Sequence, residues 1–600
     1  MSVSLLNDRD IDFLLYELLD LESVLGRPRY SEHTREIFDA SLRTARTVAE
    51  KYFADHYVKG DENEPVLENG AVKMIPETKV AWREFTGAGF LAAHQDYEEG
   101  GMQMPEVLVR TIMAYINAAN IGTAAYPFIA IGVTNLLRAF ASPEQKAKYL
   151  PLIMDGRSNG TMALTEPGQG SALGDITTTA VPSDDGSFRI FGQKMFISCA
   201  DHDIADNVIH MVLAKIKGAP AGVKGISLFI VPKYLVNDDG SLGKRNDVVV
   251  AGLNHKMGYR NATNAALNFG EKDGAIGYLV GEANKGLGYM FQMMNEARIG
   301  VALGAAAIAY QGYNYSLDYA RQRPQGRLPS CRDPQSPQVM LVEHADVRRM
   351  LLSQKAYAEG ALAMCLFASA VFEDQHTAPD PEQRKRAGLL LDLIIPVVKS
   401  WPSKYGCISN DLAIQILGGS GYIREYPVEQ LYRDQRLNPI HEGAEAIHGL
   451  DLLGRKISQH NGEGFRIFIA EVRKDIDLAS AEGVPETLGN QLDSALKKLE
   501  RTTEKLLVQC QSDIDKGLAN GTVYLDMFGR VVGAWIWLKQ ATSAQRGLNQ
   551  CHGDENENFY RGKLQAALYY SQWELPAIET MAELLDNGNS LPFEMRDEWF

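Results

Sequence analysis

The sequence predicts an α+β fold in which a β domain is inserted between helical domains, and three observations lead to this prediction. From about residue 30 to 160, apolar residues recur three and four positions apart, the spacing of amphipathic helices. From about 161 to 270 the period changes to two, in β-branched and aromatic runs such as "SFRIFGQKMFIS" and "GISLFIVP". From about 284 onwards long helical patterns return, among them "MNEARIGVALGAAAIAYQGYNYSLDYARQR".

The chain of 600 residues is too long for one hydrophobic core, so several packed domains are expected. We expect an N-terminal helical extension (1–40), an N-terminal α domain (41–160), a middle β domain (161–283), a C-terminal four-helix-bundle domain (284–468) and an additional helical domain (469–600). One helix start is well marked, because Ser142 can act as N-cap, Pro143 takes the first helical position and Gln145 closes a capping box.

The composition indicates a soluble globular protein with no nucleic-acid partner. Apolar residues make up 45% and charged residues 23% of the chain, and no basic stretch offsets the formal charge of −16. The six cysteines are scattered without a C-x-x-C pair, which suits free thiols in a reducing compartment. The N-terminus is apolar at helical spacing but acidic, unlike a secretory signal or a transit peptide. A cytoplasmic location is therefore expected.

The most apolar run, "VVGAWIWLKQ" (531–540), is too short to span a bilayer, so we expect no stable membrane insertion. Its two tryptophans, Trp535 and Trp537, could lie at a membrane surface, but plain helix packing is the favoured interpretation.

The glycine-rich stretch "MALTEPGQGSALGDI" (162–176) resembles a dinucleotide fingerprint only superficially. That fingerprint requires a helix directly after the glycines, because the pyrophosphate rests on the helix N-terminus. Here "DITTTAV" follows, which predicts a strand. The stretch is therefore either a tight turn or a binding loop in which Thr165 and Ser171 can hydrogen-bond a phosphate or a ring edge.

Two E-x-x-H pairs, Glu445 with His448 and Glu373 with His376, have the ligand spacing of di-iron carboxylate bundles. Such a site needs two further inward glutamates, and the second pair runs into the Pro- and Asp-rich loop "HTAPDPEQ". We therefore expect no metal, and regard Glu445 as a solvent-facing acid and His448 as a packing or surface residue.

Six blocks resemble the acyl-CoA dehydrogenase family and occur in its order between about residues 160 and 456: "LTEPGQGSALGD", "GQKMFISCAD", "KMGYR", "YARQRPQGR", "QILGGSGYIREYPVEQLYRD" and "IHEGAEAIHGLDLLGR". The chain length and the C-terminal appendix resemble the large-subunit branch, which includes long-chain and 3-(methylthio)propanoyl-CoA dehydrogenases. The resemblance implies that family's fold and FAD as cofactor. It also implies conversion of a fatty acyl-CoA to the trans-2-enoyl-CoA in β-oxidation, with a hydride passing to flavin N5.

The resemblance places the catalytic base at Glu442. A carboxylate is a weak base in water, with a pKa of about 4.3, and burial against the acyl chain and flavin would raise that pKa. The backbone N–H of the same glutamate would polarise the thioester carbonyl together with a flavin ribityl hydroxyl. Gly443, having no side chain, would let the thioester approach the backbone closely.

The resemblance also implies residues that bind FAD and substrate. Leu164 and Thr165 would meet the isoalloxazine, Gly170 and Ser171 the pyrophosphate or the CoA, Phe196 the flavin face, and Ser198 would supply a hydroxyl. Arg323 would reach the flavin diphosphate of a neighbouring subunit, which implies a homodimer, and Gln415, Gly418 and Gly419 would line its adenine end. Arg298, expected on the same long helix as Arg323, would face the active-site cavity, with a surface ion pair as the alternative.

Two positions depart from the family pattern, because His441 stands where Tyr is usual and Ala444 where Thr is common. An ionisable histidine beside the base could shift the pKa of Glu442. The expected electron acceptor is electron-transfer flavoprotein. The alternatives are an acyl-CoA oxidase that uses dioxygen, a 3-(methylthio)propanoyl-CoA dehydrogenase and, from another class, a non-catalytic acyl-CoA-binding scaffold. Medium to long acyl chains are expected as substrates.

Overall fold

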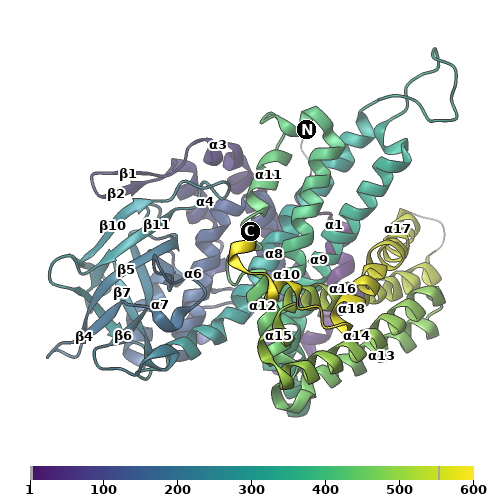
Figure 1. Cartoon of the computed structure of the whole chain (residues 1–600). Helices are drawn as coiled ribbons and strands as arrows, with labels where there is room; N and C mark the ends of the chain where they lie inside the picture. The colour runs from purple at the N-terminus through teal and green to yellow at the C-terminus, as the bar shows by residue number, and fades with distance from the viewer. Residues whose placement is uncertain (1–3, 552–554) are drawn as a thin grey trace. The chain divides into compact units, whose positions relative to one another are not determined.

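The computed structural model describes residues 4–551 and 555–600, and the chain divides into two compact units (Figure 1). One unit is Arg35–Gly300, and the other combines Met1–Thr34 with Val301–Phe600. The division falls inside the long helix α8 (Gly286–Gln322). The predicted order of helical, β and helical segments is confirmed, while the five-domain division with its exact boundaries remains a prediction.

The unit Arg35–Gly300 begins with helices, as the 3.6-residue periodicity predicts. They are α2 (Arg35–Val48), α3 (Tyr57–Glu62), α4 (Pro76–Gly87), α5 (Glu106–Ala119), α6 (Ile121–Phe140) and α7 (Pro143–Met154). The predicted capping box at the start of α7 is present: the Ser142 hydroxyl accepts from the Gln145 amide at 3.2 Å, and the Gln145 side chain accepts from the Ser142 amide at 3.1 Å.

A small hairpin of β1 (Val66–Glu68) and β2 (Ala71–Lys73) interrupts these helices, where we expected helix only. Asn69 and Gly70 form its turn, at φ +52° and +76°. An Asn-Gly pair tolerates these values, which the two-residue turn of a hairpin needs.

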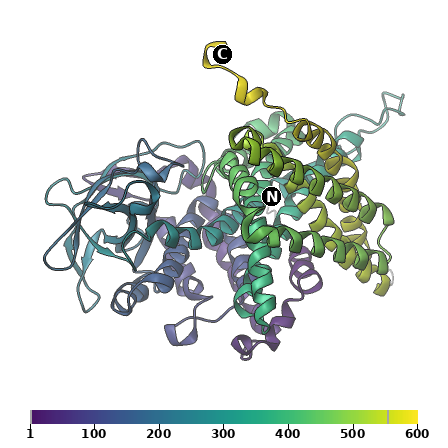
Figure 2. The same ribbon diagram turned by 60° about the horizontal axis from the view of Figure 1, so that its bottom comes forward.

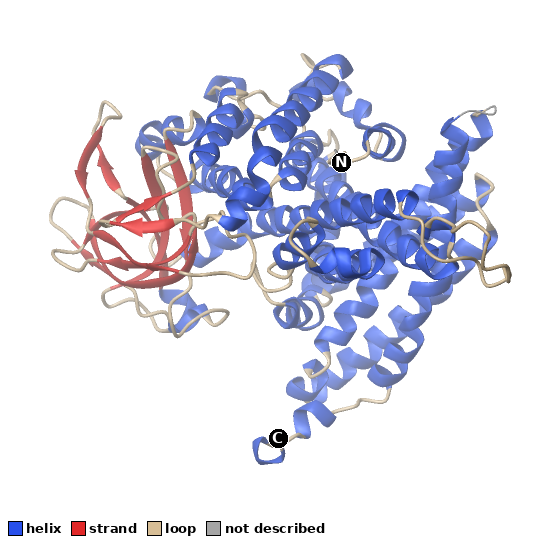
Figure 3. Ribbon diagram, turned by 90° about the horizontal axis from the view of Figure 1, so that it is seen from above, coloured by secondary structure: helices blue, strands red, loops and turns tan. Residues whose placement is uncertain are grey.

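The β region of this unit forms one sheet, whose strands are red in Figure 3. The strand order is β10-β11-β5-β12-β7-β6-β3, and β4 pairs with β5 and β6. Its strands are β3 (Ser158–Ala163), β4 (Thr179–Pro182), β5 (Phe188–Ser198), β6 (Asn207–Ile216), β7 (Ile226–Pro232), β10 (Val248–Leu253), β11 (Asn264–Phe269) and β12 (Ala275–Leu279). A separate ribbon pairs β8 (Tyr234–Val236) with β9 (Leu242–Arg245). The sheet buries an apolar face that includes Ile190, Val212 and Phe229.

The loop after β3 leads through the short turn Leu173–Asp175 to a strand that begins only at Thr179. The expected strand therefore starts later than "DITTTAV" suggested. A short turn and a strand follow the glycines, so the dinucleotide fingerprint is excluded as predicted.

Two histidines are buried in the β region of this unit without charge. His202 is 2% exposed, and both of its ring nitrogens are without a hydrogen-bond partner in the described part of the chain. His210 Nδ1 lies 2.8 Å from Thr161 Oγ1. Burial, followed by the charge of Lys233, lowers the pKa of each histidine to about 3. Both rings are therefore neutral at physiological pH.

These two histidines should make the unit sensitive to acid. Unfolded histidine has a pKa of about 6.5, so between about pH 6.5 and 3 the unfolded state binds more protons than the folded state, and stability falls as pH falls. At pH 5 each histidine is expected to cost about 2 kcal/mol relative to neutral pH. Urea unfolding at pH 7.5 and 5.0 measures the loss, and His202→Phe should reduce it by the share of one histidine, about 2 kcal/mol. An identical pH-dependent loss in that variant would contradict the assignment.

Among the described residues of the other unit, the regular elements are all helices, joined by loops such as 323–340. Helix α9 (Ala345–Thr377) packs against α10 (Pro381–Leu417), and α11 (Val428–Gln435) and α12 (Glu445–Asp451) follow. The appendix consists of α13 (Glu463–Ala481), α14 (Glu486–Ser512), α15 (Ile514–Leu518), α16 (Gly521–Gln550), α17 (Glu555–Tyr569), α18 (Ile578–Asp586) and α19 (Leu591–Glu594). Beyond α18 the chain runs out past the other helices of this unit, and Phe600 is 94% exposed (Figure 2).

Trp535 and Trp537 lie on α16 and are each 1% exposed, so helix packing is confirmed and a membrane-surface role is wrong. By length and composition α9 could cross a membrane, but 83% of its most apolar window is buried within the protein. This is the pattern of a core helix. All six cysteines are free thiols.

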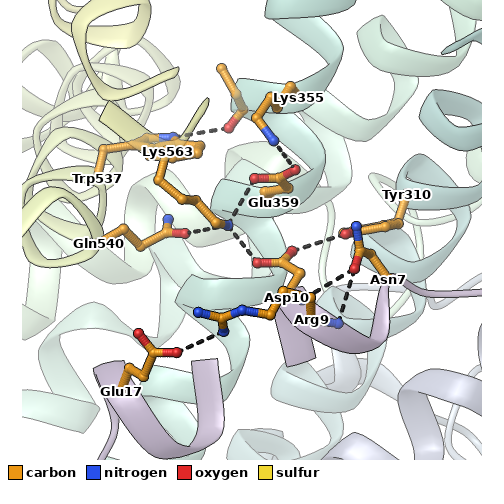
Figure 4. A network of polar contacts seen from close by, with 11 residues as sticks. Asn7, Arg9, Asp10, Glu17, Tyr310, Lys355, Glu359, Trp537, Gln540 and Lys563 are labelled. Carbon is orange, nitrogen blue, oxygen red and sulfur yellow. Dashed lines mark hydrogen bonds and ion pairs between the residues drawn. The ribbon is translucent and has the colours of Figure 1, made fainter. Parts of the chain in front are cut away.

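The N-terminal residues fold onto this unit as a broken helix. Asn7 caps α1 (Asp8–Asp12), and a π-helical turn (Phe13–Leu18) follows with Phe13 and Leu14 fully buried. Asp10 of α1 enters a buried network of charges with α9 and α17 (Figure 4).

Candidate active site

In the unit Arg35–Gly300, the glycine-rich loop of residues 164–171 leaves β3 and is held from behind by β5. Lys194 of β5 is fully buried, and its Nζ donates to the Leu164 carbonyl at 2.9 Å and to Glu166 Oε1 at 3.0 Å. The Glu166 carboxylate also accepts four hydrogen bonds of 2.5–2.9 Å from two neighbouring threonines. The base of the loop is therefore fixed by a closed network.

Both members of this buried ion pair are charged at neutral pH. Burial alone would raise the pKa of Glu166, but the Lys194 charge and the threonine hydrogen bonds outweigh it and lower the pKa to about 2. Burial lowers the pKa of Lys194 to about 8, against the opposing attraction of Glu166. The pair thus keeps full charge–charge attraction behind the loop.

Phe196 is turned out of the sheet by a β-bulge next to this loop. The pairing of β5 with β11 slips by one residue between Lys194 and Ile197, and the Met195 amide donates to the Thr165 carbonyl at 2.9 Å. Phe196 adopts φ +59° and is 64% exposed. A bulge commonly re-aims a side chain, and a bulky residue at positive φ is strained. The fold therefore exposes the Phe196 ring next to the strand residue that hydrogen-bonds Thr165, while its predicted contact with the flavin face stays a prediction.

The other predicted residues of the loop differ in exposure. Leu164 and Thr165 are partly exposed at the start of the loop, and Gly170 and Ser171 are exposed at its tip. Ser198 ends β5, where its hydroxyl accepts from Asn264 Nδ2 at 3.3 Å. The loop and the end of β5 thus expose an aromatic ring, small residues and hydroxyl groups.

In the other unit, Glu442 lies in a tight turn just before α12 and is half-buried. Glu442 adopts φ +53° and Gly443 φ +98°, so two successive residues take left-handed conformations. His448 is fully buried, and its Nε2 lies 3.2 Å from the Glu442 carbonyl oxygen. Strained backbone at a non-glycine residue is frequent at functional sites.

Gly443 is required by packing as well as by conformation. A Cβ added there would lie 2.8 Å from His448 Nε2. The predicted role of Gly443, close approach of the thioester, stays a prediction, but the structure supplies an independent reason for the glycine. His448 is a packing residue rather than a surface residue.

The two departures from the family pattern have clear structural consequences. Burial, followed by the charge of Lys399, lowers the pKa of His441 to about 3, so His441 is neutral at physiological pH and adds no charge beside Glu442. Ala444 is the N-cap residue of α12 and supplies no side-chain cap. Glu445 lies 3.3 Å from Lys404 Nζ in a partly exposed ion pair, so it is not a purely solvent-facing acid.

Arg323 and the glycine-rich end of α10 lie together at one end of the helices of this unit. Arg323 follows directly after the last residue of α8, rather than on the helix as expected, and is exposed. The Tyr319 hydroxyl near it donates to Ser420 Oγ at 3.3 Å, which joins this end of α8 to the turn after α10. At that turn Gln415, Gly418 and Gly419 are exposed.

Arg298 lies on α8 within the unit Arg35–Gly300 and is 5% exposed. The alternative of a surface ion pair is therefore wrong, while its predicted position in the active-site cavity stays a prediction. Among the described residues, no group of three or more His, Cys, Asp or Glu side chains could hold a metal ion.

The chain matches four family models in succession. They are "Acyl-CoA dehydrogenase, N-terminal domain" (39–157), "Acyl-CoA dehydrogenase, middle domain" (161–271), "Acyl-CoA dehydrogenase, C-terminal domain" (284–457) and "Acetyl-CoA dehydrogenase C-terminal like" (468–596). It is 34% identical to 3-methylmercaptopropionyl-CoA dehydrogenase of Ruegeria pomeroyi, over 97% of this chain and 98% of that protein. The chain belongs to the acyl-CoA dehydrogenase family.

Two further comparisons place it among the large members. It is 33% identical to the broad-specificity linear acyl-CoA dehydrogenase FadE5 of Mycobacterium tuberculosis, over 99% of both chains. The crystal structure of an acyl-CoA dehydrogenase complexed with FAD from Bacillus anthracis superimposes with a TM-score of 0.72 at 22% identity, covering 92% of this chain and 88% of that one. This acyl-CoA dehydrogenase is thus an FAD-dependent oxidoreductase of fatty-acid metabolism with the family's additional C-terminal domain.

Three features of this acyl-CoA dehydrogenase fit FAD. The exposed Phe196 ring beside Thr165 offers a stacking surface, and Gly168 and Gly170 have nothing within 4 Å of the position of a Cβ, so that the loop tip is open. The exposed guanidinium of Arg323 can pair with a diphosphate.

Three charged residues that hold the candidate site in place were not predicted from the sequence, although each stands out in its sequence context. Lys399 interrupts the apolar run "LLLDLIIPVVKSW" of α10, and Lys194 falls on an inward position of the alternating strand β5. Glu166 lies inside the glycine-rich motif itself. A charge at a core position is costly unless it is paired, so such residues are candidates for positioning a site.

Proposed function

We propose that this acyl-CoA dehydrogenase oxidises a fatty acyl-CoA to its trans-2-enoyl-CoA, with Glu442 taking the proton from the α-carbon. The observation that carries the proposal is the turn at Glu442, where a non-glycine residue at φ +53° precedes Gly443 at φ +98°. A strained backbone at a half-buried glutamate is typical of a functional site, where the direction of the carboxylate is important for the reaction. Bound FAD supplies the acceptor for the hydride from the β-carbon.

Residues of this chain have separate tasks in the proposed reaction. The Glu442 carboxylate accepts the α-proton, and its backbone N–H donates to the thioester oxygen as negative charge develops there. Phe196 covers one face of the flavin, and Thr165 with Ser171 holds its polar edge. The Lys194–Glu166 pair fixes the loop that carries these groups.

An anaerobic titration tests the proposal against its alternatives. The purified protein should show a flavin absorbance spectrum, and acyl-CoA should bleach it without oxygen, with recovery by electron-transfer flavoprotein, the proposed acceptor. Rapid recovery in air alone would favour an acyl-CoA oxidase. A protein that takes up FAD but is not bleached, or that takes up no FAD, would favour the acyl-CoA-binding scaffold.

We further propose a homodimer in which Arg323 binds the flavin diphosphate of the neighbouring subunit. The support is the exposed position of Arg323 beside the exposed Gln415, Gly418 and Gly419. Arg323→Ala should weaken FAD binding about tenfold or more, because a charge-assisted hydrogen bond contributes about 1.5–3 kcal/mol. FAD content after dialysis measures this effect. Arg332→Ala, in the same exposed loop, should retain FAD, and equal FAD content in the two variants would contradict the cross-subunit role.

Medium to long acyl chains are the proposed substrates, with 3-(methylthio)propanoyl-CoA as the second candidate because of the similarity to the Ruegeria enzyme. A profile of kcat/KM against acyl length, with the methylthio substrate included, decides between them. The cytoplasmic location also remains a prediction.

A further inference from the structure

Lys399 lies on α10 and is 1% exposed, in a stretch of the helix where Val397, Val398 and Trp401 are also buried. Burying an ammonium group is unfavourable unless its donors are satisfied. Its Nζ donates to the Asn438 carbonyl at 2.8 Å and to the Gly443 carbonyl at 2.8 Å. The side chain therefore contacts the backbone of the turn that carries Glu442.

The two carbonyl groups bracket Glu442. Asn438 is four residues before it and Gly443 one residue after it, so that one ammonium group ties the two ends of the turn together. Within this segment the amides of Ile440 and His441 both donate to the Leu437 carbonyl, at 2.9 and 3.2 Å. The turn is thus held both by its own hydrogen bonds and by Lys399.

The left-handed conformation of Glu442 needs such external support. A non-glycine residue at φ +53° is less stable there than in the helical or extended regions, and it persists only when surrounding contacts hold it. His448 Nε2, 3.2 Å from the Glu442 carbonyl, is the second contact on the same turn. If the contacts of Lys399 are lost, Glu442 can relax and its carboxylate and amide both change direction.

We propose that Lys399 is a positioning residue for the reaction, whose ammonium group holds the Glu442 turn in its strained conformation and so aims the carboxylate and the amide. The inference rests on the proposed role of Glu442. Lys399 thus orients the catalytic groups in addition to stabilising the fold.

The test compares Lys399→Met with Lys456→Met in the FAD-loaded enzyme. Lys456 is a suitable control because it is also buried in this unit and pairs with Asp392, two turns before Lys399 on α10. In anaerobic stopped-flow experiments, Lys399→Met should slow flavin bleaching per bound flavin about 100-fold, the effect expected from a misplacement of about 1 Å. The Kd for acyl-CoA should change little. Lys456→Met should lower thermal stability but bleach at the wild-type rate.

Hydrogen exchange supplies a readout that does not depend on turnover. Lys399→Met should speed amide exchange in the segment 437–444, whereas Lys456→Met should leave that segment unchanged. Lys399→Arg keeps charge and donors, so it should recover part of the bleaching rate, and it remains informative if the methionine variant does not fold.

Three results would overturn the inference: wild-type bleaching in Lys399→Met, equal slowing in both methionine variants, or unchanged exchange over 437–444. Failure of the proposed function is distinguishable, because it would appear as normal bleaching in Glu442→Gln. Loss of bleaching in Glu442→Gln together with normal bleaching in Lys399→Met would leave the function in place and remove only the role of Lys399.

Discussion

Glu442→Gln should retain FAD and acyl-CoA while losing about 1,000-fold or more in the rate of anaerobic flavin bleaching. The amide has nearly the shape of the carboxylate and can occupy the same turn, but it cannot accept the α-proton. A positioned general base contributes about 100- to 10,000-fold, and the substitution removes this term without removing a backbone donor. Stopped-flow absorbance with saturating acyl-CoA measures the rate, and the spectral change on ligand binding without reduction measures retained affinity.

Glu445→Gln is the matched control for this experiment. Glu445 lies three residues further along, in the first turn of α12, and pairs with Lys404 at 3.3 Å. Its loss should leave bleaching nearly unchanged, because an exposed ion pair contributes little. If Glu442→Gln bleached normally and Glu445→Gln did not, the base would have to be reassigned to Glu445.

The fold could be predicted from the sequence wherever one periodicity extended over many residues. The helices α8, α9 and α10 and the strands of the β sheet each carry such a pattern, and the Ser142 capping box marks a helix start without reference to the rest of the chain. The short hairpin at Val66–Lys73 was missed because strands of three residues give too little alternation. Its Asn69-Gly70 turn was the available signal.

The site could be predicted as residue types in motifs, but not as geometry. The resemblance identified Glu442 and Phe196, yet no pattern in the sequence shows that both take positive φ values, since backbone conformation at single residues depends on tertiary contacts. The same holds for Lys194 and Lys399, whose acceptors are mostly backbone carbonyls. Every residue has a backbone carbonyl, so the sequence does not show which carbonyl accepts from a given lysine.

His441 illustrates a prediction that needed the surroundings. An ionisable histidine beside the base could have shifted the pKa of Glu442, but burial and the Lys399 charge keep the ring neutral, with a pKa of about 3. Lys399 is 42 residues away in the sequence. The charge state of His441 therefore depends on the packing of the turn against α10, which the sequence pattern does not show.

Lys563→Met should cause the largest loss of stability in the unit that contains the appendix, about 3–5 kcal/mol, the usual cost of breaking a buried ion pair. Lys563 of α17 is fully buried, and its Nζ lies 2.5 Å from Asp10 Oδ1, 2.8 Å from Glu359 Oε2 and 3.0 Å from Gln540 Oε1 (Figure 4). Glu359 also pairs with Lys355. Two carboxylates and two ammonium groups thus balance inside the protein.

If the stability loss in Lys563→Met comes from unbalanced charge, a second substitution that removes one carboxylate should reduce it. Lys563→Met leaves the two carboxyl groups of Asp10 and Glu359 with Lys355 as the one remaining ammonium group of the network. The double variant with Asp10→Asn removes one carboxyl group as well, so that one carboxylate again faces one ammonium group. The double variant should therefore lose less stability than the sum of the single variants, as coupled neighbours do. Lys505→Ala, which breaks an exposed contact to Asp586, should cost under about 1 kcal/mol.

Denaturant unfolding of the FAD-loaded enzyme measures these differences, and limited proteolysis near residues 4–30 reports whether the N-terminal segment is released. Because Asp10 lies on α1, Glu359 on α9 and Lys563 on α17, the network joins the N-terminal segment, the central helices and the appendix of this unit. Loss of Lys563 should therefore expose the N-terminal segment to protease before the core helices unfold. Additive single variants, or a loss in Lys563→Met no larger than in Lys505→Ala, would show instead that apolar packing of Phe13 and Leu14 holds the segment without help from the charges.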